Sequence, residues 1–419
     1  MDLKGKKVTV IGAAKSGVAA VNLVLAAGGM PRISDARSME VIAAAIAGFS
    51  DIPAVAVEAG GHTRDFIQGS DLVVASPGVW KDAAPLQWAR EEGIPVMGEI
   101  EFAWRFCRKP VIAVTGSNGK TTTATLIAKV LEAAGLKACL CGNVGVPFSE
   151  VVGGGSVDYF VVEISSFQLE LVETFRPHIA VLLNFSQNHL DRHPDMHDYF
   201  NAKKRIFMNQ TGEDHAVLNA DDPLVQGVAV GLSSHINFFH RAGTANPNFL
   251  AVAAVARILD IPEGVVADVC ASFPGVEHRM EKVRIVEGVE YINDSKSTTV
   301  EAGRWALERL DRPAVMIAGG YDKRLDYASL TELVRKKVTA LVVMGVIKEQ
   351  LRDTFEEVLP VAVIRGGLED AVACAQRLAV PGDCILFSPM TASFDMFDNF
   401  EQRGRVFKQI VHRLGDEHA

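Results

Sequence analysis

The stretch VIAVTGSNGKTTT, residues 111–123, decides how this chain folds and where it binds. A β-branched run, Val111 to Val114, leads into a glycine turn, and the segment after the turn repeats apolar residues at helical spacing. Gly135 stands where the C-terminal cap of that helix is expected. Four of the apolar residues fall on one helical stripe: Leu126, Ile127, Val130 and Leu131. The order strand, glycine loop, helix is the context in which phosphate-binding loops work.

The loop itself departs from the common phosphate-binding pattern, G-x-x-x-x-G-K-[ST]. Gly119, Lys120 and Thr121 match its end, but the first glycine is replaced by Val114. Backbone N–H groups at the helix start would hold phosphate oxygens, Lys120 would supply a positive charge and the Thr121 hydroxyl would ligate Mg²⁺. A chance glycine turn is the alternative, and the coincidence of strand, glycines, Lys-Thr and helix disfavours it.

Composition bounds the class of protein. The chain has 419 residues, 48% of them hydrophobic and 22% charged, which is ordinary for a globular protein. The net charge of -9 argues against a nucleic-acid surface. Neither a signal-peptide layout nor an apolar run of membrane-spanning length is present, so we expect a cytoplasmic protein with no membrane contact. Its six cysteines are then reduced and mostly buried thiols.

Short β-rich runs alternate with helical patterns throughout, which predicts an α/β fold with parallel sheets. We expect three domains: a Rossmann-like domain over residues 1–98, a central P-loop mononucleotide-binding domain over 99–275, and a C-terminal Rossmann-like domain over 276–419. Ligands of such sheets bind at the carboxyl ends of the strands, where the polar motifs of this chain occur.

The first domain opens with KVTVIGAAKSG, in which Gly12 and Gly17 match the outer glycines of the dinucleotide pattern G-x-G-x-x-G. Ala14 replaces the middle glycine, and Asp35 stands where a ribose-binding acid would fall. These residues alone leave two interpretations open, a dinucleotide site of an oxidoreductase or an ordinary tight turn.

Carboxylates and basic residues near the phosphate loop are candidates for a metal site. Glu163 ends the apolar run DYFVVE, where it can face the cation of a nucleotide or simply close a strand. His189, Asp191 and His193 in NHLDRH have a spacing that invites a metal interpretation, although a single trio is not specific. For Lys203, on the same helical side as Tyr199 and Phe207, spacing alone favours a solvated lysine.

Taken in order, the motifs of the chain resemble those of the Mur ligase family, the ATP-dependent amide-bond-forming enzymes of bacterial cell-wall synthesis. The phosphate loop of that family reads T-G-[ST]-x-G-K-[ST], so the missing first glycine is a family trait. The other matching segments extend over nearly the whole chain: GNVGVP, EISSFQLE, NHLDRH, NAKKRIF, NADD, HRME, NDSKST and SFDMFDNFEQRG.

The resemblance implies an ADP-forming carboxylate–amine ligase that joins D-glutamate to UDP-N-acetylmuramoyl-L-alanine through an acyl phosphate. It implies ATP and two Mg²⁺ ions, a monomer, and no nucleic-acid partner. Another Mur ligase, or a folate-polyglutamating ligase, remains the alternative within the family. A nucleotide-dependent binding or switch protein is the alternative outside it.

The resemblance also assigns residues to ligands. ATP would be held by the phosphate loop and three residues beyond it: Gly116, Ser117, Asn118, Gly119, Lys120, Thr121, Thr122, Asn246, Arg279 and Asp294. The metal ligands would be Thr121, Glu163, His189 and a carbamylated Lys203. The substrates would be bound by Ala14, Lys15, Asp35, Arg37, Asn143 and His189 on the UDP-linked side and by Thr298, Lys323, Ser393 and Phe400 for D-glutamate. The catalytic residues would be Lys120, His189, Lys203 and Lys296.

Two positions depart from the family pattern. Asn188 replaces an aspartate that commonly precedes the metal-site histidine, which puts one supporting acid in doubt. Ala245 replaces the histidine that usually precedes Asn246, which weakens the placement of Asn246 at adenine.

Overall fold

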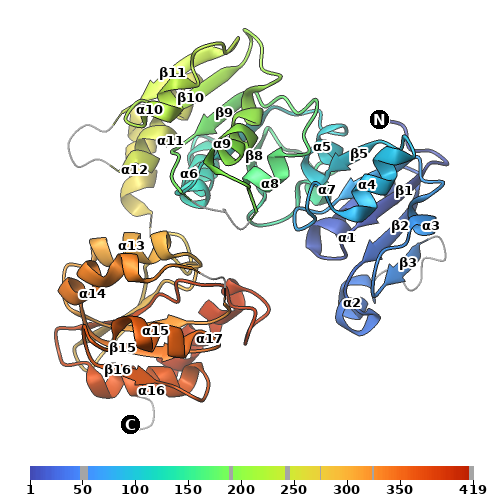
Figure 1. Cartoon of the computed structure of the whole chain (residues 1–419). Helices are drawn as coiled ribbons and strands as arrows, with labels where there is room; N and C mark the ends of the chain where they lie inside the picture. Colours follow the sequence, from blue (N-terminus) through green and yellow to red (C-terminus); the bar gives the residue numbers. More distant parts are fainter. Residues whose placement is uncertain (48–54, 188–191, 241–245, 274, 323–324, 415–419) are drawn as a thin grey trace. The chain divides into compact units, whose positions relative to one another are not determined.

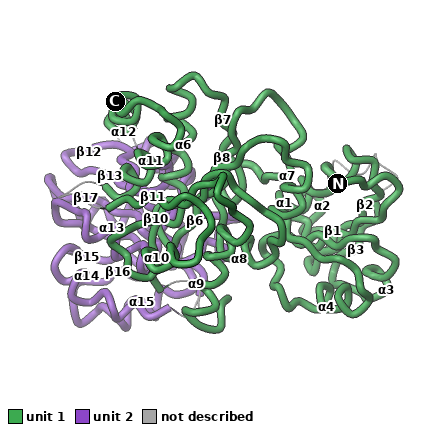
Figure 2. Tube along the Cα trace, turned by 90° about the horizontal axis from the view of Figure 1, so that it is seen from above, with its two compact units in different colours: residues 1–273 green, residues 274–419 purple. Residues whose placement is uncertain are grey.

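The computed structural model describes residues 1–47, 55–187, 192–240, 246–273, 275–322 and 325–414. The chain divides into two compact units, residues 1–273 and 274–419 (Figure 2). Three parallel-type sheets with helices around them make up these units (Figure 1), so the predicted α/β class with three sheet-based modules is confirmed. None of the described helices is long and apolar enough to cross a membrane.

The first sheet of unit 1 is fully parallel, with strand order β3-β2-β1-β4-β5. This is the order of a Rossmann-like half-sheet, in which the first strand is central. Its elements are β1 (Lys7–Ile11), α1 (Lys15–Ala26), β2 (Met30–Asp35), α2 (Met39–Ile46), β3 (Ala56–Ala59), α3 (Arg64–Ile67), β4 (Leu72–Ala75), α4 (Ala84–Glu91) and β5 (Val96–Gly98).

The second sheet of unit 1 is also fully parallel, with strand order β11-β10-β9-β6-β8-β7. Its strands are β6 (Val111–Thr115), β7 (Ala138–Gly142), β8 (Tyr159–Glu163), β9 (Ile179–Leu182), β10 (His215–Asn219) and β11 (His235–Phe239). Its helices are α5 (Glu99–Trp104), α6 (Lys120–Ala133), α7 (Phe148–Val151), α8 (Ser166–Leu169), α9 (Met196–Lys204), α10 (Pro223–Gly227), α11 (Pro247–Ile258) and α12 (Glu263–Ser272). A 3₁₀ turn, Arg205–Phe207, extends α9.

The sheet of unit 2 has strand order β12-β13-β17-β14-β15-β16, and only the edge pair β12–β13 is antiparallel. Its strands are β12 (Glu281–Val286), β13 (Val289–Asn293), β14 (Ala314–Gly319), β15 (Val338–Met344), β16 (Val361–Val363) and β17 (Cys384–Phe387). Its helices are α13 (Val300–Arg309), α14 (Thr331–Lys337), α15 (Lys348–Phe355), α16 (Leu368–Leu378) and α17 (Phe400–Arg413), with a 3₁₀ turn at Ala328–Leu330.

Helix α6 forms as its sequence predicts. It begins directly after Gly119 and ends at Ala133, and Gly135 follows with a φ of 81°, a conformation that glycine adopts without strain. The four residues of the predicted stripe are all buried, in one cluster with Val252 and Val255 of α11. Burying a leucine or isoleucine side chain stabilises a fold by about 1.5–3 kcal/mol. The helix that follows the phosphate loop is therefore held from its buried face.

The six cysteines are unpaired, as predicted, but the expectation that most are buried is wrong. Only Cys141 and Cys384 are buried, and the other four are partly exposed. Sequence cannot decide this point, because a small apolar side chain packs equally well in a core and at its edge.

The two sheets of unit 1 are packed together rather than tethered by a linker. Helix α5, which follows the last strand of the first sheet, is buried, and it carries two buried glutamates. Glu99 accepts hydrogen bonds from the backbone N–H and hydroxyl of Ser149, at 2.7 and 2.6 Å. Glu101 binds the segment from Glu173 to Phe175 and the side chain of Arg105. These contacts fix α5, the segment that leaves the first sheet, onto the central sheet module.

Glu101 is the more strongly held of the two. One carboxylate oxygen accepts three backbone N–H groups of the 173–175 segment at 2.9–3.0 Å, and the other accepts from Thr174 Oγ1 and Arg105 Nε. Burial alone would raise the pKa of Glu101, but these hydrogen bonds outweigh it and hold the pKa below its ordinary value. The folded state therefore favours the charged form.

We predict that Glu101→Gln lowers the free energy of unfolding of unit 1 by about 2–4 kcal/mol at neutral pH, because an amide NH₂ would oppose buried N–H donors. Urea unfolding followed by tryptophan fluorescence measures it, since Trp104 lies on α5 and packs on Phe175. In the wild type this contribution is present above the unfolded-state pKa and is lost as pH falls through the lowered folded-state pKa. The variant lacks that pH dependence.

The matched control is Glu173→Gln, whose exposed carboxylate lies 3.6 Å from Arg105. It should change stability by less than about 0.5 kcal/mol. Equal stability of the Glu101→Gln variant and the wild type at neutral pH would contradict the role assigned to Glu101.

Candidate nucleotide-binding site

The glycine loop between β6 and α6 requires both of its glycines. Gly116 has a φ of 150° and Gly119 a φ of 83°, conformations that other residues rarely adopt. A Cβ atom at Gly119 would lie 2.3 Å from Asn248 Oδ1, and one at Gly116 would lie 3.0 Å from Leu183 Cβ. Position 114 needs no glycine, because β6 continues through it to Thr115. The loop therefore lacks the usual first glycine because residue 114 still belongs to strand β6.

Two lysine side chains converge on one carbonyl group of the loop. Lys120 Nζ donates to the carbonyl oxygens of Gly116 and Ser117, each at 3.0 Å. Lys203 Nζ donates to the same Gly116 oxygen at 2.8 Å. Lys203 is 1% exposed, so the solvated lysine that helical spacing favoured is wrong. The loop, which lies far from α9 in sequence, covers that face of the helix.

The environment of Lys203 disfavours its charged form. Its pKa is lowered well below the ordinary value, first by burial and then by repulsion from Lys120, while Glu163 opposes the shift. The amine lies 4.6 Å from the centre of the Tyr199 ring. A lowered pKa favours the neutral form of the amine, which is the nucleophilic one.

Glu163 ends β8 beside the loop and is 2% exposed, as its place in the sequence predicted. Asn143 Nδ2 donates to Glu163 Oε1 at 2.7 Å. Glu163 Oε2 is buried and accepts no hydrogen bond within the described part of the chain. A buried carboxylate oxygen of this kind is suited to a cation. Together with the buried hydroxyl residue Thr121, it offers the hard oxygen ligands that Mg²⁺ prefers.

Three residues support the loop through contacts that the sequence did not predict: Asn184, Tyr199 and Asn248. Asn184 Oδ1 accepts from the backbone N–H of Asn118 at 2.8 Å, and its Nδ2 donates to the Asn118 carbonyl at 3.0 Å. The Tyr199 hydroxyl lies 3.2 Å from Ser117 Oγ. Asn248 lies over Gly119. The position of Asn184 could have been predicted, because it follows the end of β9 just as Glu163 ends β8. The contacts of Tyr199 and Asn248 depend on how distant segments pack, which the sequence pattern does not show.

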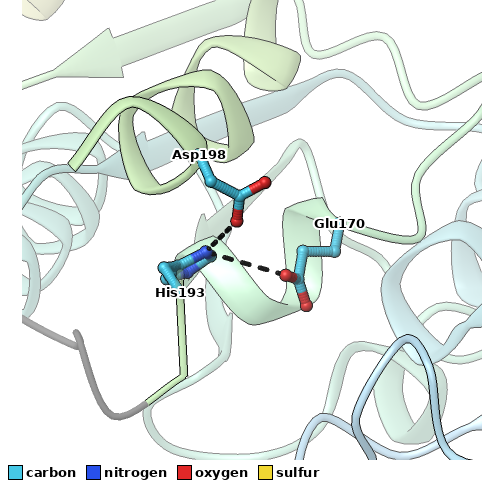
Figure 3. Close-up of side chains that lie close together, drawn as sticks. All are labelled: Glu170, His193 and Asp198. Atoms are coloured by element: carbon cyan, nitrogen blue, oxygen red, sulfur yellow. Dashed lines mark hydrogen bonds and ion pairs between the residues drawn. The ribbon is translucent and has the colours of Figure 1, made fainter. Parts of the chain in front are cut away.

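Of the residues in NHLDRH, His189 and Asp191 lie outside the described residues. His193 is buried, and both of its ring nitrogens are engaged. Figure 3 shows its contacts with Asp198 and Glu170. Nδ1 lies 2.8 Å from Asp198 Oδ2, and Nε2 lies 2.9 Å from Ser166 Oγ. Glu170 completes a group of three potential ligands, 3.7 Å from Nδ1. Lys81 and Arg192 already compensate its negative charge, so the group resembles an ion-pair network more than a metal centre.

In the first sheet, Asp35 closes the glycine turn after β1. It accepts from the backbone N–H of Ala13 at 2.6 Å and pairs with Arg37 at 2.7 Å. Burial would raise its pKa, but the Arg37 and backbone hydrogen bonds lower it to about 2. Ala14 and Lys15 are exposed at the start of α1. A Cβ at Gly17 would lie 1.8 Å from the Gly12 carbonyl oxygen, so this glycine is required for the helix to approach the strand.

In unit 2, Asp294 follows β13 and is fully buried. It accepts from Ser388 Oγ at 2.7 Å and from the backbone N–H of Met280 at 3.2 Å. Burial raises the pKa of Asp294 to about 7. Arg279 lies with its guanidinium 4.7 Å from the centre of the Trp305 ring.

The remaining predicted residues of unit 2 are only partly brought together. Lys296 Nζ lies 5.0 Å from the centre of the Phe400 ring, and the Phe400 carbonyl accepts from Ser295 Oγ. Thr298 is half-buried, Ser393 is buried and Lys323 lies outside the described residues. In unit 1, Asn246 caps α11 by accepting from the N–H of Asn248, and Thr122 is half-buried.

A parallel sheet whose glycine loop leads through Lys-Thr into a helix, beside a buried strand-end glutamate, defines a P-loop nucleotide-binding protein. Three family models match the chain: the Mur ligase MurD-like N-terminal domain over residues 6–98, the Mur ligase middle domain over 114–281, and the Mur ligase glutamate ligase domain over 278–390. The chain belongs to the Mur ligase family, as its motifs predicted.

Curated relatives match along their whole lengths. A UDP-N-acetylmuramoylalanine--D-glutamate ligase of Geotalea uraniireducens is 39% identical, with 99% of each chain covered. The protein of the same name from Pelotomaculum thermopropionicum is 40% identical, again with 99% of each covered. Among solved structures, a UDP-N-acetylmuramate-alanine ligase from Thermotoga maritima has a TM-score of 0.60 at 18% identity, covering 98% of this chain and 100% of that one. That likeness shows the shared fold.

Proposed function

We propose that this chain is an ATP-dependent ligase that joins D-glutamate to UDP-N-acetylmuramoyl-L-alanine, a cytoplasmic step of peptidoglycan precursor synthesis on which cell shape and division depend. Full-length relatives that carry the corresponding name support this substrate pair. The observation that carries the chemistry is the convergence of Lys120, Lys203 and Glu163 on the shortened glycine loop. This is the charge distribution that phosphoryl transfer requires.

The reaction has two steps. The terminal carboxylate of UDP-N-acetylmuramoyl-L-alanine attacks the γ-phosphorus of ATP, forming an acyl phosphate and releasing ADP. The neutral amine of D-glutamate then attacks the acyl carbon, the C–O bond to phosphate breaks, and an amide, inorganic phosphate and a proton are the products. The protein contributes mainly position and charge to such transfers.

Residues of the chain are proposed to divide the work by module. The module over 1–98 binds the UDP group through Ala14, Lys15, Asp35 and Arg37, and Asn143 contacts the muramoyl group. The module over 99–275 binds the triphosphate through the glycine loop, and Lys120 stabilises the charge of the transferring phosphoryl group. Asn246, also in that central module, contacts the nucleotide. The module over 276–419 contributes Arg279 and Asp294 at the nucleotide and Lys296 at the phosphoryl group. Its D-glutamate site is formed by Thr298, Lys323, Ser393 and Phe400.

Mg²⁺ would be held by Thr121, Glu163, His189 and a carbamylated Lys203, and it would supply neutralisation of phosphate charge. The unsatisfied Glu163 Oε2 supports such a cation. Carbamylation of Lys203 is supported by the burial of its amine and by its lowered pKa, since the neutral form of an amine adds to CO₂ to form a carbamate with release of one proton. The product is an anionic oxygen ligand in place of a cation, which suits a hard metal.

We predict that ADP, phosphate and the new amide form in equal amounts, and only when ATP, UDP-N-acetylmuramoyl-L-alanine and D-glutamate are all present. Mass spectrometry of products from a panel of acceptors (L-alanine, D-glutamate, meso-diaminopimelate, L-lysine and a folate) measures the specificity. Phosphate release without amide would indicate a plain NTPase, and a different preferred amino acid would indicate another member of the family.

We predict that Lys120→Ala lowers kcat by about 10²–10³-fold, because it removes a positive charge aimed at the transferring phosphoryl group. Lys129→Ala on the same helix is the matched control, since Lys129 is exposed and should leave kcat unchanged. Wild-type turnover by the Lys120→Ala variant would remove the glycine loop from the mechanism.

We predict that Lys203→Ala loses most of its activity and that short carboxylic acids restore part of it by supplying the missing oxygen ligand. Lys204→Ala, one residue further along α9, is the control and should remain active. An independent readout is a carbamate signal by NMR after incubation with isotopically labelled bicarbonate, present in the wild type and absent from Lys203→Ala. An unimpaired Lys203→Ala variant, or no carbamate in the wild type, would refute the modification.

A further inference from the structure

Arg192, in the NHLDRH motif of the central sheet module, reaches across to the first sheet module. Its Nη1 donates to the carbonyl oxygen of Gly78 at 3.2 Å, and its Nη2 donates to the carbonyl oxygen of Val79 at 2.7 Å. Both carbonyls belong to the loop that follows β4 of the first sheet. A single guanidinium thus fixes two successive peptide groups, each through a different nitrogen of its rigid planar fork.

The contact is buried and its charge is compensated. The Arg192 side chain is 8% exposed, and its Nη2 lies 3.5 Å from the 6% exposed carboxylate of Glu170. The guanidinium also lies 5.2 Å from the centre of the Trp80 ring, in the same loop, and 4.5 Å from that of Phe167 on α8. Lys81, the next residue of the loop, points its ammonium group back at Glu170 and Asp198, at 3.8 and 3.4 Å.

On the central-module side of this contact, helices α8 and α9 are connected to each other. His193 joins α8 to α9 through hydrogen bonds to Ser166 and Asp198. Figure 3 shows the carboxylates of Asp198 and Glu170 both facing Nδ1 of its ring. Phe167 stacks on His193 with ring centres 5.7 Å apart. The loop after β4 is therefore held against two helices that His193 joins to each other.

On both sides of the contact lie residues that are proposed to bind the same substrate: the UDP group on the first sheet module and the reacting carboxylate on the central module. On the first sheet, Ser76 at the start of the loop donates to the Gly12 carbonyl at 3.1 Å, and Val79 packs against the Gly12 turn proposed to hold UDP. On the central sheet, α8 begins three residues after Glu163, and α9 carries Lys203. Arg192 thus lies between the proposed UDP subsite and the proposed phosphoryl-transfer site.

We propose that Arg192 is a positioning residue that locks the loop Gly78–Lys81 onto helices α8 and α9, and so sets the distance between the UDP end and the reacting carboxylate of the bound substrate. The proposal rests on the proposed function for the identity of that substrate. A ligand that occupies only the first sheet module does not sense this distance, whereas a ligand that extends across both modules does. Displacements of about 1 Å at a reacting group can lower turnover by about 10²-fold.

The test compares two ligands on Arg192→Lys, which keeps the charge but loses the fork. Calorimetry gives the Kd of UDP and of UDP-N-acetylmuramoyl-L-alanine, and product formation gives kcat. The Kd of UDP should stay within about twofold, while the Kd of the whole substrate rises and kcat falls, each about tenfold or more. Trp80→Leu, at an exposed position, should shift the whole-substrate Kd in the same direction by less.

Arg205→Lys is the matched control, because Arg205 also donates to two backbone carbonyls, of Leu169 and Val172, but both lie within the central module. It should change neither Kd beyond about twofold. The proposal would be overturned if Arg192→Lys weakened the binding of both ligands equally or changed neither Kd. It would also be overturned if Arg205→Lys showed the same selective loss of whole-substrate binding. Absence of amide product from the wild type would instead refute the proposed function, and the ratio of the two Kd values would still test the lock.

Discussion

The carbonyl oxygen of Gly116 is the acceptor on which the candidate site depends, because the amines of Lys120 and Lys203 both donate to it. Burial is the main cause of the lowered pKa of Lys203, and repulsion by the ammonium group of Lys120 adds to it. Both effects favour the neutral form of Lys203. Lys120 lies across the loop at the helix start, where a positive charge can serve phosphate.

This arrangement requires the glycine loop to come within reach of α9, and the central sheet enforces it. Register pairs Val114 of β6 with Glu163 of β8 and Thr115 with Leu182 of β9, so the three strands end at one edge. Parallel strands bring their carboxyl ends together by construction. The loop, the acid and the supporting asparagine Asn184 are therefore neighbours because of the sheet, although the sequence separates them by tens of residues.

The same rule shows how far sequence could predict the site. Strand-end position correctly placed Glu163, and helical periodicity correctly gave the buried stripe of α6. Periodicity failed for Lys203, because it identifies the side of a helix on which a residue lies but not the distant segment that covers that side. Periodicity could not predict the contacts of Arg192 either. Its partners are backbone carbonyls 113 and 114 residues away, and a backbone carbonyl leaves no pattern in the sequence.

Buried arginines recur in this chain as fasteners of loops rather than as partners of acids alone. Arg192 binds the carbonyls of Gly78 and Val79, and Arg403 of α17 binds those of Ser295 and Thr391. Burial lowers the pKa of Arg403 to about 10, which still leaves it charged at neutral pH. A permanent cation of fixed geometry can satisfy two carbonyls at once without a proton equilibrium of its own. Arg192 and Arg403 fix their loops with a cation of fixed shape, whereas the lowered pKa of buried Lys203 favours its neutral form.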